Sequence, residues 1–333
     1  MKNIAALRIN MTDDPNATPE QVSARYQAAV EMAAYADSHQ FKVVSLEEHH
    51  CADNGWLPSP LIMAAAIAAR TKAISINVTA LLVTLYDPLR LAEDIAVIDL
   101  LSAGRFSFVA GMGYRPEEYH AMNKDYDRRG QLMDEVIEVL LKAWSGEEFS
   151  YRGRTVNIRP LPLSRPHPFF FVGGMSKAAA RRAAKFGLPF YPPMAMPELE
   201  KLYYKELEKH GNSGFVYYPK EANSMLFIDD DPERAWRELA PYFLNETREY
   251  GSWKRDDVRR PSEDNITTLD GLRSHKRFEI MTPQQCLDRL RENERYTVVC
   301  HPLVGGLPIE KGWHYLSNFV DKVWLPHTES NRP

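Results

Sequence analysis

Short apolar runs alternate with longer amphipathic stretches along the whole chain. Eight runs are short and rich in β-branched or aromatic residues, as is typical of buried strands: residues 4–9, 43–46, 74–82, 105–110, 169–172, 188–192, 224–228 and 296–300. The stretches between them place apolar residues at helical spacing, as Val22, Tyr26, Ala29 and Ala33 do on one predicted helix. The pattern therefore predicts eight strand–helix units.

Helix starts support the same division of the chain. Five predicted helices begin with Ser, Thr or Asp followed by Pro: Thr18-Pro19, Ser59-Pro60, Asp87-Pro88, Asp231-Pro232 and Thr282-Pro283. The first residue can cap the helix, and Pro suits the first helical position. Strands that alternate with helices predict a parallel sheet, and eight units predict an α/β (β/α)8 TIM barrel, here as one domain over residues 1–333. An open doubly wound sheet is the alternative.

The segment 250–280 interrupts this rhythm, because it is charged, weakly periodic and contains Pro261 and Gly271. A long stretch without regular structure in a compact domain is usually a lid or a surface insertion. It lies between the seventh and eighth predicted strands, on the side where a barrel keeps its active site. We therefore predict a mobile lid, with an insertion that has no role as the alternative.

Composition narrows the class of protein. The 333 residues carry a net charge of −4 with both signs mixed, so nucleic acid and anionic membranes are not expected partners. No apolar run approaches the roughly 20 residues of a membrane span, and the first residues do not resemble a signal peptide, which predicts a cytoplasmic protein. Cys51, Cys286 and Cys300 are few and far apart, which indicates reduced thiols.

Candidate chemistry is concentrated after the second predicted strand, where Glu47, Glu48, His49 and His50 follow one another. Titratable groups at the C-terminal end of a buried parallel strand are where α/β folds place their active sites. Histidine exchanges protons near neutral pH, because its ordinary pKa is about 6.5. The alternative is a solvated strand end with histidines of no chemical role. No HExxH motif or cysteine cluster accompanies them, so no metal site is predicted.

Two glycine-containing stretches suggest a bound phosphate or cofactor. Gly173-Gly174-Met175-Ser176 joins a predicted strand to a helix, where bare backbone and free amides favour a phosphate. The alternative is an ordinary turn in which Ser176 caps the helix. The second stretch, residues 111–113, has the spacing of a dinucleotide fingerprint, but Pro116 breaks the pattern and no helix is expected to start there. A nicotinamide site is therefore poorly supported.

Three stretches together resemble the bacterial luciferase-like flavin monooxygenases. They are EEHH at 47–50, DPLRLAEDIAVIDLLSAGRF at 87–106 and FVGG at 171–174, and the resemblance covers about residues 1–325. It implies a barrel that binds reduced FMN at its C-terminal mouth and uses O2 to oxygenate a small organic substrate. A separate flavin reductase would supply the reduced FMN. Relatives that use the deazaflavin F420 for hydride transfer, and relatives that bind flavin without catalysis, are the alternatives.

The resemblance also implies roles for individual residues. His49 is the expected acid/base, with Glu48 and His50 beside it. The expected cofactor-binding residues are Thr79, Ala80, Gly111, Met112, Arg129, Gly173, Gly174, Met175 and Ser176, with Arg128 as the alternative to Arg129 for the phosphate. A non-prolyl cis peptide is expected between Thr79 and Ala80, and a homodimer is expected through the helices at 61–70 and 89–101.

Two positions depart from the luciferases themselves. Gly111 stands where they carry a cysteine, and Met175 stands where they carry an acid. We therefore do not expect light emission or the use of long-chain aldehydes, and contacts to the flavin near Met175 are expected to differ.

Overall fold

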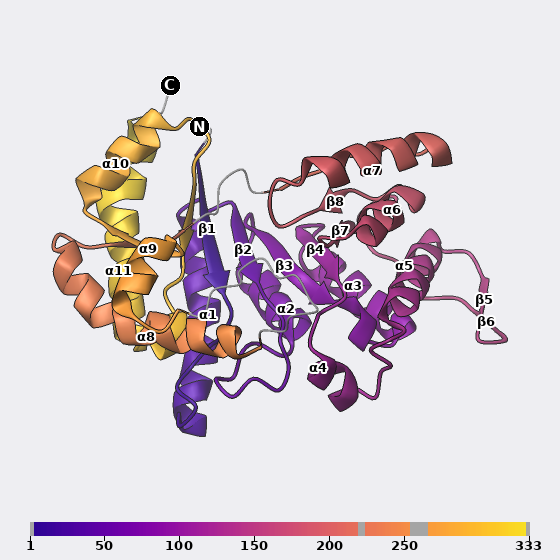
Figure 1. The fold of residues 1–333 in the computed structure, drawn as a ribbon, viewed down its shortest axis with the longest axis horizontal. Coiled ribbons are helices and arrows are strands. Elements are labelled where there is room, and N and C mark those ends of the chain that lie inside the picture. The colour runs from indigo at the N-terminus through magenta and orange to yellow at the C-terminus, as the bar shows by residue number, and fades with distance from the viewer. Residues whose placement is uncertain (1–2, 219–223, 254–265, 331–333) are drawn as a thin grey trace.

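Helices pack around a parallel sheet of nine strands (Figure 1). The structure, a computed structural model, describes residues 3–218, 224–253 and 266–330. Six strands follow one another in chain order: β1 (Ile4–Ile9), β2 (Val43–Leu46), β3 (Ser75–Leu82), β4 (Phe106–Gly111), β7 (Phe169–Gly173) and β8 (Phe190–Tyr191). On the other side of β1 lie β11 (Thr297–Cys300), β9 (Met225–Ile228) and β10 (Phe278–Met281). No strand pairing is seen between β8 and β10 in the part of the chain described.

The strand order confirms the predicted fold class. A doubly wound sheet reverses its strand order at a switch point, whereas β1 to β8 run in one direction around the sheet and β11 returns to the free side of β1. The strand pairings within this sheet are all parallel in the described part of the chain, as expected for a (β/α)8 TIM barrel. A separate antiparallel hairpin is also present, as β5 (Phe149–Tyr151) and β6 (Arg154–Val156).

Five helices begin at a Pro that follows a predicted capping residue: Pro19, Pro60, Pro88, Pro232 and Pro283. Further helices connect or flank the strands. The α-helices in the described part of the chain are α1 (Pro19–Ser38), α2 (Pro60–Arg70), α3 (Pro88–Leu101), α4 (Pro116–Ala121), α5 (Arg129–Ser145), α6 (Lys177–Lys185), α7 (Pro197–His210), α8 (Pro232–Ser252), α9 (Leu269–His275), α10 (Pro283–Glu292), α11 (Ile309–Phe319) and α12 (Leu325–Glu329). Thr18 and Thr282 form complete capping boxes. In Figure 1, α8 to α11 flank one end of the sheet and α5 to α7 the other.

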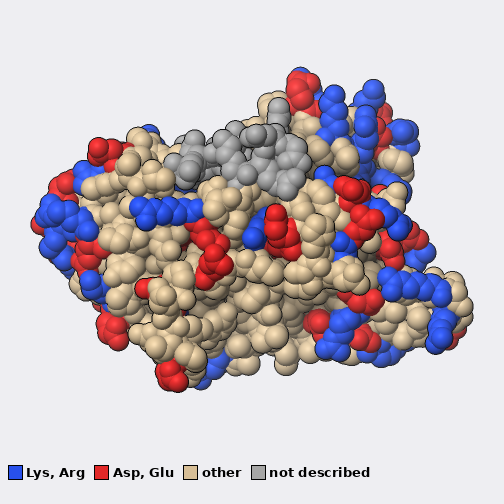
Figure 2. Space-filling model, turned by 60° about the horizontal axis from the view of Figure 1, so that its bottom comes forward, with Lys and Arg blue, Asp and Glu red and all other residues tan. Residues whose placement is uncertain are grey.

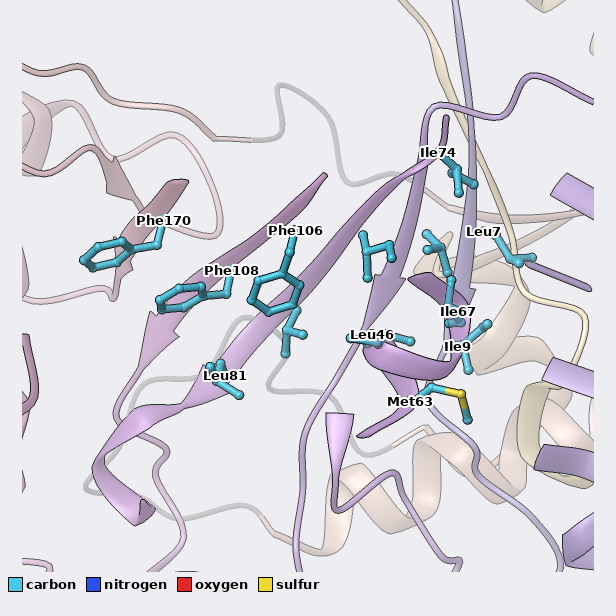
Figure 3. Close-up of a cluster of buried hydrophobic side chains, with 14 of the residues drawn as sticks. Leu7, Ile9, Leu46, Met63, Ile67, Ile74, Leu81, Phe106, Phe108 and Phe170 are labelled. Atoms are coloured by element: carbon cyan, nitrogen blue, oxygen red, sulfur yellow. The ribbon is translucent and has the colours of Figure 1, made fainter. Parts of the chain in front are cut away.

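The main core lies between the sheet and the surrounding helices. Figure 3 shows side chains from β1, β2, β4 and α2 in one apolar cluster, among them Leu7, Leu46 and Ile67. Phe108 of β4 and Phe170 of β7 stack with ring centroids 4.8 Å apart and planes only 3° from parallel. Burying each such side chain contributes about 1.5–3 kcal/mol, so this cluster holds the strand ends in place.

The prediction that 250–280 lacks regular structure was wrong for its described part. Helix α8 continues to Ser252, and α9 and β10 follow within the segment. Phe278 stacks on Phe243 with centroids 4.0 Å apart, and Leu272 is fully buried in the same second cluster. These apolar positions are few and separated by charged residues, so they produce no period that a sequence pattern can register. The remainder of the predicted lid, residues 254–265, lies outside the described residues.

The expectation at Pro116 was also wrong, because α4 begins there. Pro is favoured at the first position of a helix, and Glu117 and Glu118 occupy the first turn, where acidic side chains are stabilised by the helix dipole. The helix has six residues, too few to show a helical period in the sequence.

Charged side chains of both signs are interspersed on the surface. Figure 2 shows Lys and Arg among Asp and Glu, gathered mainly towards the two ends of the visible face. In the described part of the chain, no helix is both long and apolar enough to cross a membrane. The cytoplasmic location remains a prediction. Cys51 is exposed, Cys286 and Cys300 are buried, and all three are free thiols.

Candidate active site

His49 and Glu118 meet at the C-terminal end of β2. His49 Nδ1 lies 3.1 Å from Glu118 Oε1, and the same oxygen accepts the backbone N–H of His50 at 3.0 Å. Arg115 Nη1 is 3.4 Å from that oxygen. Burial alone would raise the pKa of Glu118, but the contacts with His49, His50 and Arg115 together hold it below its ordinary value. Glu118 is therefore a carboxylate at neutral pH.

His50 is held by a different carboxylate. Its Nε2 lies 3.0 Å from Glu48 Oε1, which also accepts the Tyr86 hydroxyl at 2.6 Å. Glu48 Oε2 accepts the backbone N–H of Leu82 at 2.6 Å, which ties the end of β2 to the end of β3. Burial and the nearby Glu48 raise the pKa of Tyr86, so its hydroxyl remains a donor. The predicted group of Glu48, His49 and His50 is thus gathered at one place, with each histidine facing its own acid.

Aromatic rings surround His49. The centroid distances from its imidazole are 4.6 Å to Trp253, 5.1 Å to Trp56, 5.9 Å to Tyr114 and 6.2 Å to Tyr250. The Arg115 guanidinium stacks 4.0 Å above the Trp253 ring. The His49 side chain is only 11% exposed. Apolar rings exclude water and strengthen charge interactions, so the pair of His49 and Glu118 lies in a dry environment.

Small residues end the neighbouring strands. The predicted non-prolyl cis peptide between Thr79 and Ala80 is confirmed. A Cβ added to Gly111 at the end of β4 would come within 2.7 Å of Ala80 Cβ, so only glycine fits there. Gly173 ends the adjacent β7, and a Cβ added there would likewise lie 2.7 Å from Val109 Cγ1. The ends of β3, β4 and β7 therefore present backbone rather than large side chains.

The turn after β7 leads into α6 as predicted. Gly174 has φ of +146° and packs so closely on Ala179 that an added Cβ would lie 2.7 Å away. Ser176 is the N-cap of α6, and its hydroxyl accepts the Ala179 N–H at 3.2 Å. The capping interpretation of Ser176 is thus present in the structure, and the residue is also exposed at the start of a helix, where amides favour anions. Met175 is half-buried in the same turn.

Two further predicted cofactor residues already have protein contacts. The Met112 carbonyl accepts the Thr84 hydroxyl at 3.0 Å. Arg129 stacks 4.0 Å above the Tyr126 ring and donates to the Tyr126 carbonyl at 2.9 Å. Arg128 is exposed and donates to Gln131. Neither arginine is directed at the Gly174–Ser176 turn by any contact in the structure.

A buried ionic cluster lies beside the site. Glu47 pairs with Arg8 of β1 through two hydrogen bonds of 2.6 and 2.9 Å. Arg8 also donates to Glu246 of α8 at 2.8 Å, and Glu246 Oε2 lies 2.8 Å from Nε2 of His301. All four residues of the EEHH stretch therefore have partners. Glu47 belongs to the ionic cluster, His49 contacts Glu118, and His50 contacts Glu48.

Sequence reasoning missed Glu118, Trp253 and Glu246. Glu118 lies 69 residues after His49 on a helix that was not expected. Trp253 and Glu246 belong to a stretch that adjoins or overlaps the predicted lid. The only local signal was the Pro-Glu-Glu start of α4, which indicates a helix but not which glutamate faces inward.

The residues present fit a flavin. The bare ends of β3, β4 and β7 leave backbone for a flat ring system to approach, and α6 offers its N-terminal amides to a phosphate. Trp56 Nε1 and Glu118 Oε2 are buried without a hydrogen-bond partner in the described part of the chain, as expected of groups placed beside a ligand. No group of three or more metal-ligating side chains occurs among the described residues.

Comparison with known proteins identifies relatives over most of the chain. The family model described as luciferase-like monooxygenase matches residues 8–300. The uncharacterized protein y4wF of Sinorhizobium fredii is 31% identical over 183 residues, which are 54% of this chain and 52% of the relative. The alkanal monooxygenase alpha chain of Photorhabdus luminescens is 24% identical over 79% of this chain and 81% of its own. The chain spans about half the length of several curated relatives it matches.

Solved structures share the fold over nearly the whole chain. Monooxygenase RslO1 from Streptomyces bottropensis is 22% identical with a TM-score of 0.73, covering 98% of this chain and 100% of its own. The oxygenating constituent of 3,6-diketocamphane monooxygenase from Pseudomonas putida, in complex with FMN, is 17% identical with a TM-score of 0.67, covering 97% and 98%. An F420-dependent secondary alcohol dehydrogenase is 14% identical with a TM-score of 0.65, again covering 97% and 98%. These TM-scores, over nearly the whole length of each chain, establish a common fold.

Proposed function

Because the chain belongs to the luciferase-like monooxygenase family, we propose that it is an FMN-dependent monooxygenase that uses O2 to oxygenate a small organic substrate. Bound reduced FMN supplies the electrons that activate oxygen. A separate flavin reductase delivers it in a transient encounter. The absence of a luciferase cysteine at Gly111 argues against light emission.

The pair of His49 and Glu118 carries this proposal. A monooxygenase needs a group that gives and takes a proton in a site from which water is excluded. His49 is a histidine backed by a buried carboxylate at 3.1 Å and covered by Trp253 and Trp56. A solvated strand end with histidines of no role would show neither the buried acid nor the rings. We assign the acid/base role to His49, while Glu48 and His50 hold the end of β2 against β3.

The cofactor residues follow from the strand ends. Thr79, Ala80 and Gly111 form the surface for the flavin ring, with Met112 beside it. The phosphate is received at the start of α6 by Gly173, Gly174, Met175 and Ser176. Arg129, at the start of α5, is the further candidate. Arg129 would have to leave Tyr126 to reach a phosphate, so Ser176 and the α6 amides are the main phosphate ligands.

An F420-dependent hydride transfer is the second candidate, because a protein with that activity shares the fold at a TM-score of 0.65. Titration of the protein with FMN, reduced FMN and F420 separates the two. We expect reduced FMN to bind in preference to F420, and oxygen uptake with reduced FMN to increase with the right member of a substrate panel. Tight F420 binding without any binding of FMN would reject the monooxygenase, and binding of FMN without turnover across a broad panel would favour a flavin-binding protein without catalysis.

The phosphate assignment is tested by Ser176→Ala. Removing the hydroxyl should weaken FMN binding about tenfold and leave riboflavin binding unchanged, because riboflavin has no phosphate. Isothermal titration with both ligands measures the difference. Thr282→Ala removes the equivalent N-cap from α10 and controls for the loss of about 1 kcal/mol of helix capping. Equal weakening of both flavins by Ser176→Ala would place the phosphate elsewhere.

A further inference from the structure

We infer that Glu118 is a positioning residue for His49: its carboxylate holds the imidazole in the tautomer with the proton on Nδ1 and so makes Nε2 the nitrogen that exchanges protons with the reactants. The inference rests on the proposed function for its catalytic consequence, but its structural part stands on the geometry of the free protein. Nothing in the EEHH stretch indicates it, because Glu118 comes from α4.

The hydrogen-bond pattern determines the tautomer. A carboxylate only accepts hydrogen bonds, so the 3.1 Å contact between Glu118 Oε1 and His49 Nδ1 requires the hydrogen to be on Nδ1. In a neutral imidazole the other nitrogen then carries the lone pair. His49 Nε2 has no hydrogen-bond partner among the described residues, whereas the ring is in contact with Trp253 and Trp56. The basic nitrogen is therefore left for a ligand.

His50 shows the opposite arrangement. Its Nε2 faces Glu48 at 3.0 Å, and that carboxylate is already shared with Tyr86 and the Leu82 amide. The two adjacent histidines are thus held through opposite nitrogens by two separate acids. Only His49 keeps Nε2 available beside the aromatic rings, which is the structural reason to assign the proton exchange to His49 and a holding role to His50.

Glu118 itself is held rigidly. The His50 backbone N–H donates to Oε1 at 3.0 Å, so the carboxylate is attached to the same turn as the imidazole it orients. Arg115 lies 3.4 Å from the same oxygen and donates to the His50 carbonyl at 2.7 Å. The Glu118 side chain is fully buried. An orienting group held by backbone contacts can position a catalytic side chain closely.

The charge of Glu118 has a second effect. When His49 takes a proton, the imidazolium lies directly against the carboxylate in a dry site, where opposite charges attract strongly. Glu118 Oε2 is buried and has no hydrogen-bond partner in the described part of the chain, so no hydrogen bond compensates this oxygen before that step. In the described part of the chain, the rings of Tyr114 and Tyr250 and the Arg115 guanidinium over Trp253 also lie near His49.

Nitrogen-15 NMR of histidine-labelled protein tests the tautomer directly. The chain has 10 histidines, and His49→Asn assigns the His49 signals by their loss. We expect the wild type, without any flavin, to show protonated Nδ1 and unprotonated Nε2 for His49. Glu118→Ala should move the signals towards the Nε2-protonated form that a free imidazole prefers. Glu117→Ala, an exposed neighbour of the same charge on α4, should leave them unchanged.

The wild-type spectrum alone can overturn the inference, because a neutral His49 imidazole that carries its one ring hydrogen on Nε2 contradicts it, even if Glu118→Ala fails to fold. Glu118→Gln separates orientation from charge, since an amide oxygen still accepts from Nδ1. It should keep the tautomer but lose about tenfold in kcat, and Glu118→Ala about a hundredfold, with KM little changed. Unchanged kcat in both variants would reject the catalytic consequence. A wild type that shows the expected tautomer but no turnover would reject the proposed function and leave the role of Glu118 in orienting His49 intact.

Discussion

His49 and His50 are neighbours in the chain with the same ordinary chemistry, yet the structure gives them different surroundings. His50 Nε2 is engaged by Glu48, whereas His49 is bound by Glu118 at Nδ1 and its Nε2 has no hydrogen-bond partner among the described residues. The residue type makes proton exchange near neutral pH possible. The contact with a buried acid on one side and with aromatic rings on the other decides which histidine can use it.

Replacing His49 should therefore remove catalysis without unfolding the protein. His49→Ala should lower kcat for substrate-dependent oxygen uptake by about a hundredfold, because the proton-exchanging group is lost. His120→Ala, at an exposed position on α4, serves as the control and should keep the wild-type rate. Circular dichroism checks that both variants are folded. A wild-type rate in folded His49→Ala would exclude the acid/base role.

At the scale of elements, α8 forms the wall beside His49. Its last turn carries Tyr250 and leads to Trp253, whose rings face His49. One turn earlier, Glu246 accepts hydrogen bonds from Arg8 and Asn10 of the β1 region and lies against His301 after β11. This buried carboxylate fastens the helix to the ends of the strands. The position of the aromatic wall thus depends on a contact outside the wall itself.

The same cluster makes stability depend on pH. Burial would raise the pKa of Glu246, but Arg8, His301 and Arg277 hold it well below its ordinary 4.5. Burial lowers the pKa of His301 below its ordinary 6.5 despite the nearby Glu246. Both groups bind protons more weakly folded than unfolded, so both contributions are present at neutral pH. We expect the free energy of unfolding to fall as pH drops below about 6.5, and further below about 4.5, in denaturant titrations.

Glu246→Gln should show how much of this stability the carboxylate supplies. The variant should lose about 3–5 kcal/mol of unfolding free energy at pH 7, because Arg8 keeps only one of its two acidic partners in a buried site. Its loss of stability between pH 5 and pH 3 should be smaller than in the wild type. Glu233 lies at the start of the same helix and pairs with Arg273 of α9 at the surface, so Glu233→Gln should change stability by less than about 0.5 kcal/mol. A Glu246→Gln variant as stable as the wild type would show that the cluster does not hold α8.

At the scale of the whole molecule, α2 and α3 leave large apolar side chains on the surface. Ile62 is 74% exposed and Leu101 is 54% exposed, with Val97 and Leu100 beside them on α3. The two helices contact each other, so these residues lie on adjacent elements. Apolar residues gathered on neighbouring helices mark interaction sites. The homodimer predicted from the sequence through these helices stays a proposal, and these residues are its expected contact surface.

Charge introduced at this surface should separate the subunits. The wild type is expected to be a dimer at micromolar concentration in light scattering, and the double variant Ile62→Glu/Leu101→Glu a monomer, because burying two carboxylates in an apolar contact is unfavourable. Leu163→Glu changes an equally exposed leucine, at 54%, outside both helices and should remain dimeric. A monomeric wild type would refute the dimer, and a dimeric double variant would place the interface elsewhere.

Local patterns were sufficient for most of the fold. Pro after a capping residue marks helix starts through φ restriction and a side-chain hydrogen bond within three residues, so Thr18 and Thr282 were readable without any tertiary contact. Strand β10 and helix α9 were not, because their burial comes from contacts such as Phe278 on Phe243, 35 residues earlier in the chain. A sequence window does not contain the partner that makes such a residue buried.

Some features of the site are likewise local in the sequence, and others depend on tertiary contacts. The sequence by itself determined that two acids and two histidines follow β2, and that small residues end β4 and β7, because strand ends and glycines are local features. Only the tertiary structure decided which acid supports which histidine. Glu118 is one of 45 acidic residues and follows the exposed Glu117, and nothing local distinguishes the two. The packing of α4 against the turn after β2 buries one carboxylate against His49 and leaves its neighbour in water, since a contact across 69 residues exists only once the chain has folded.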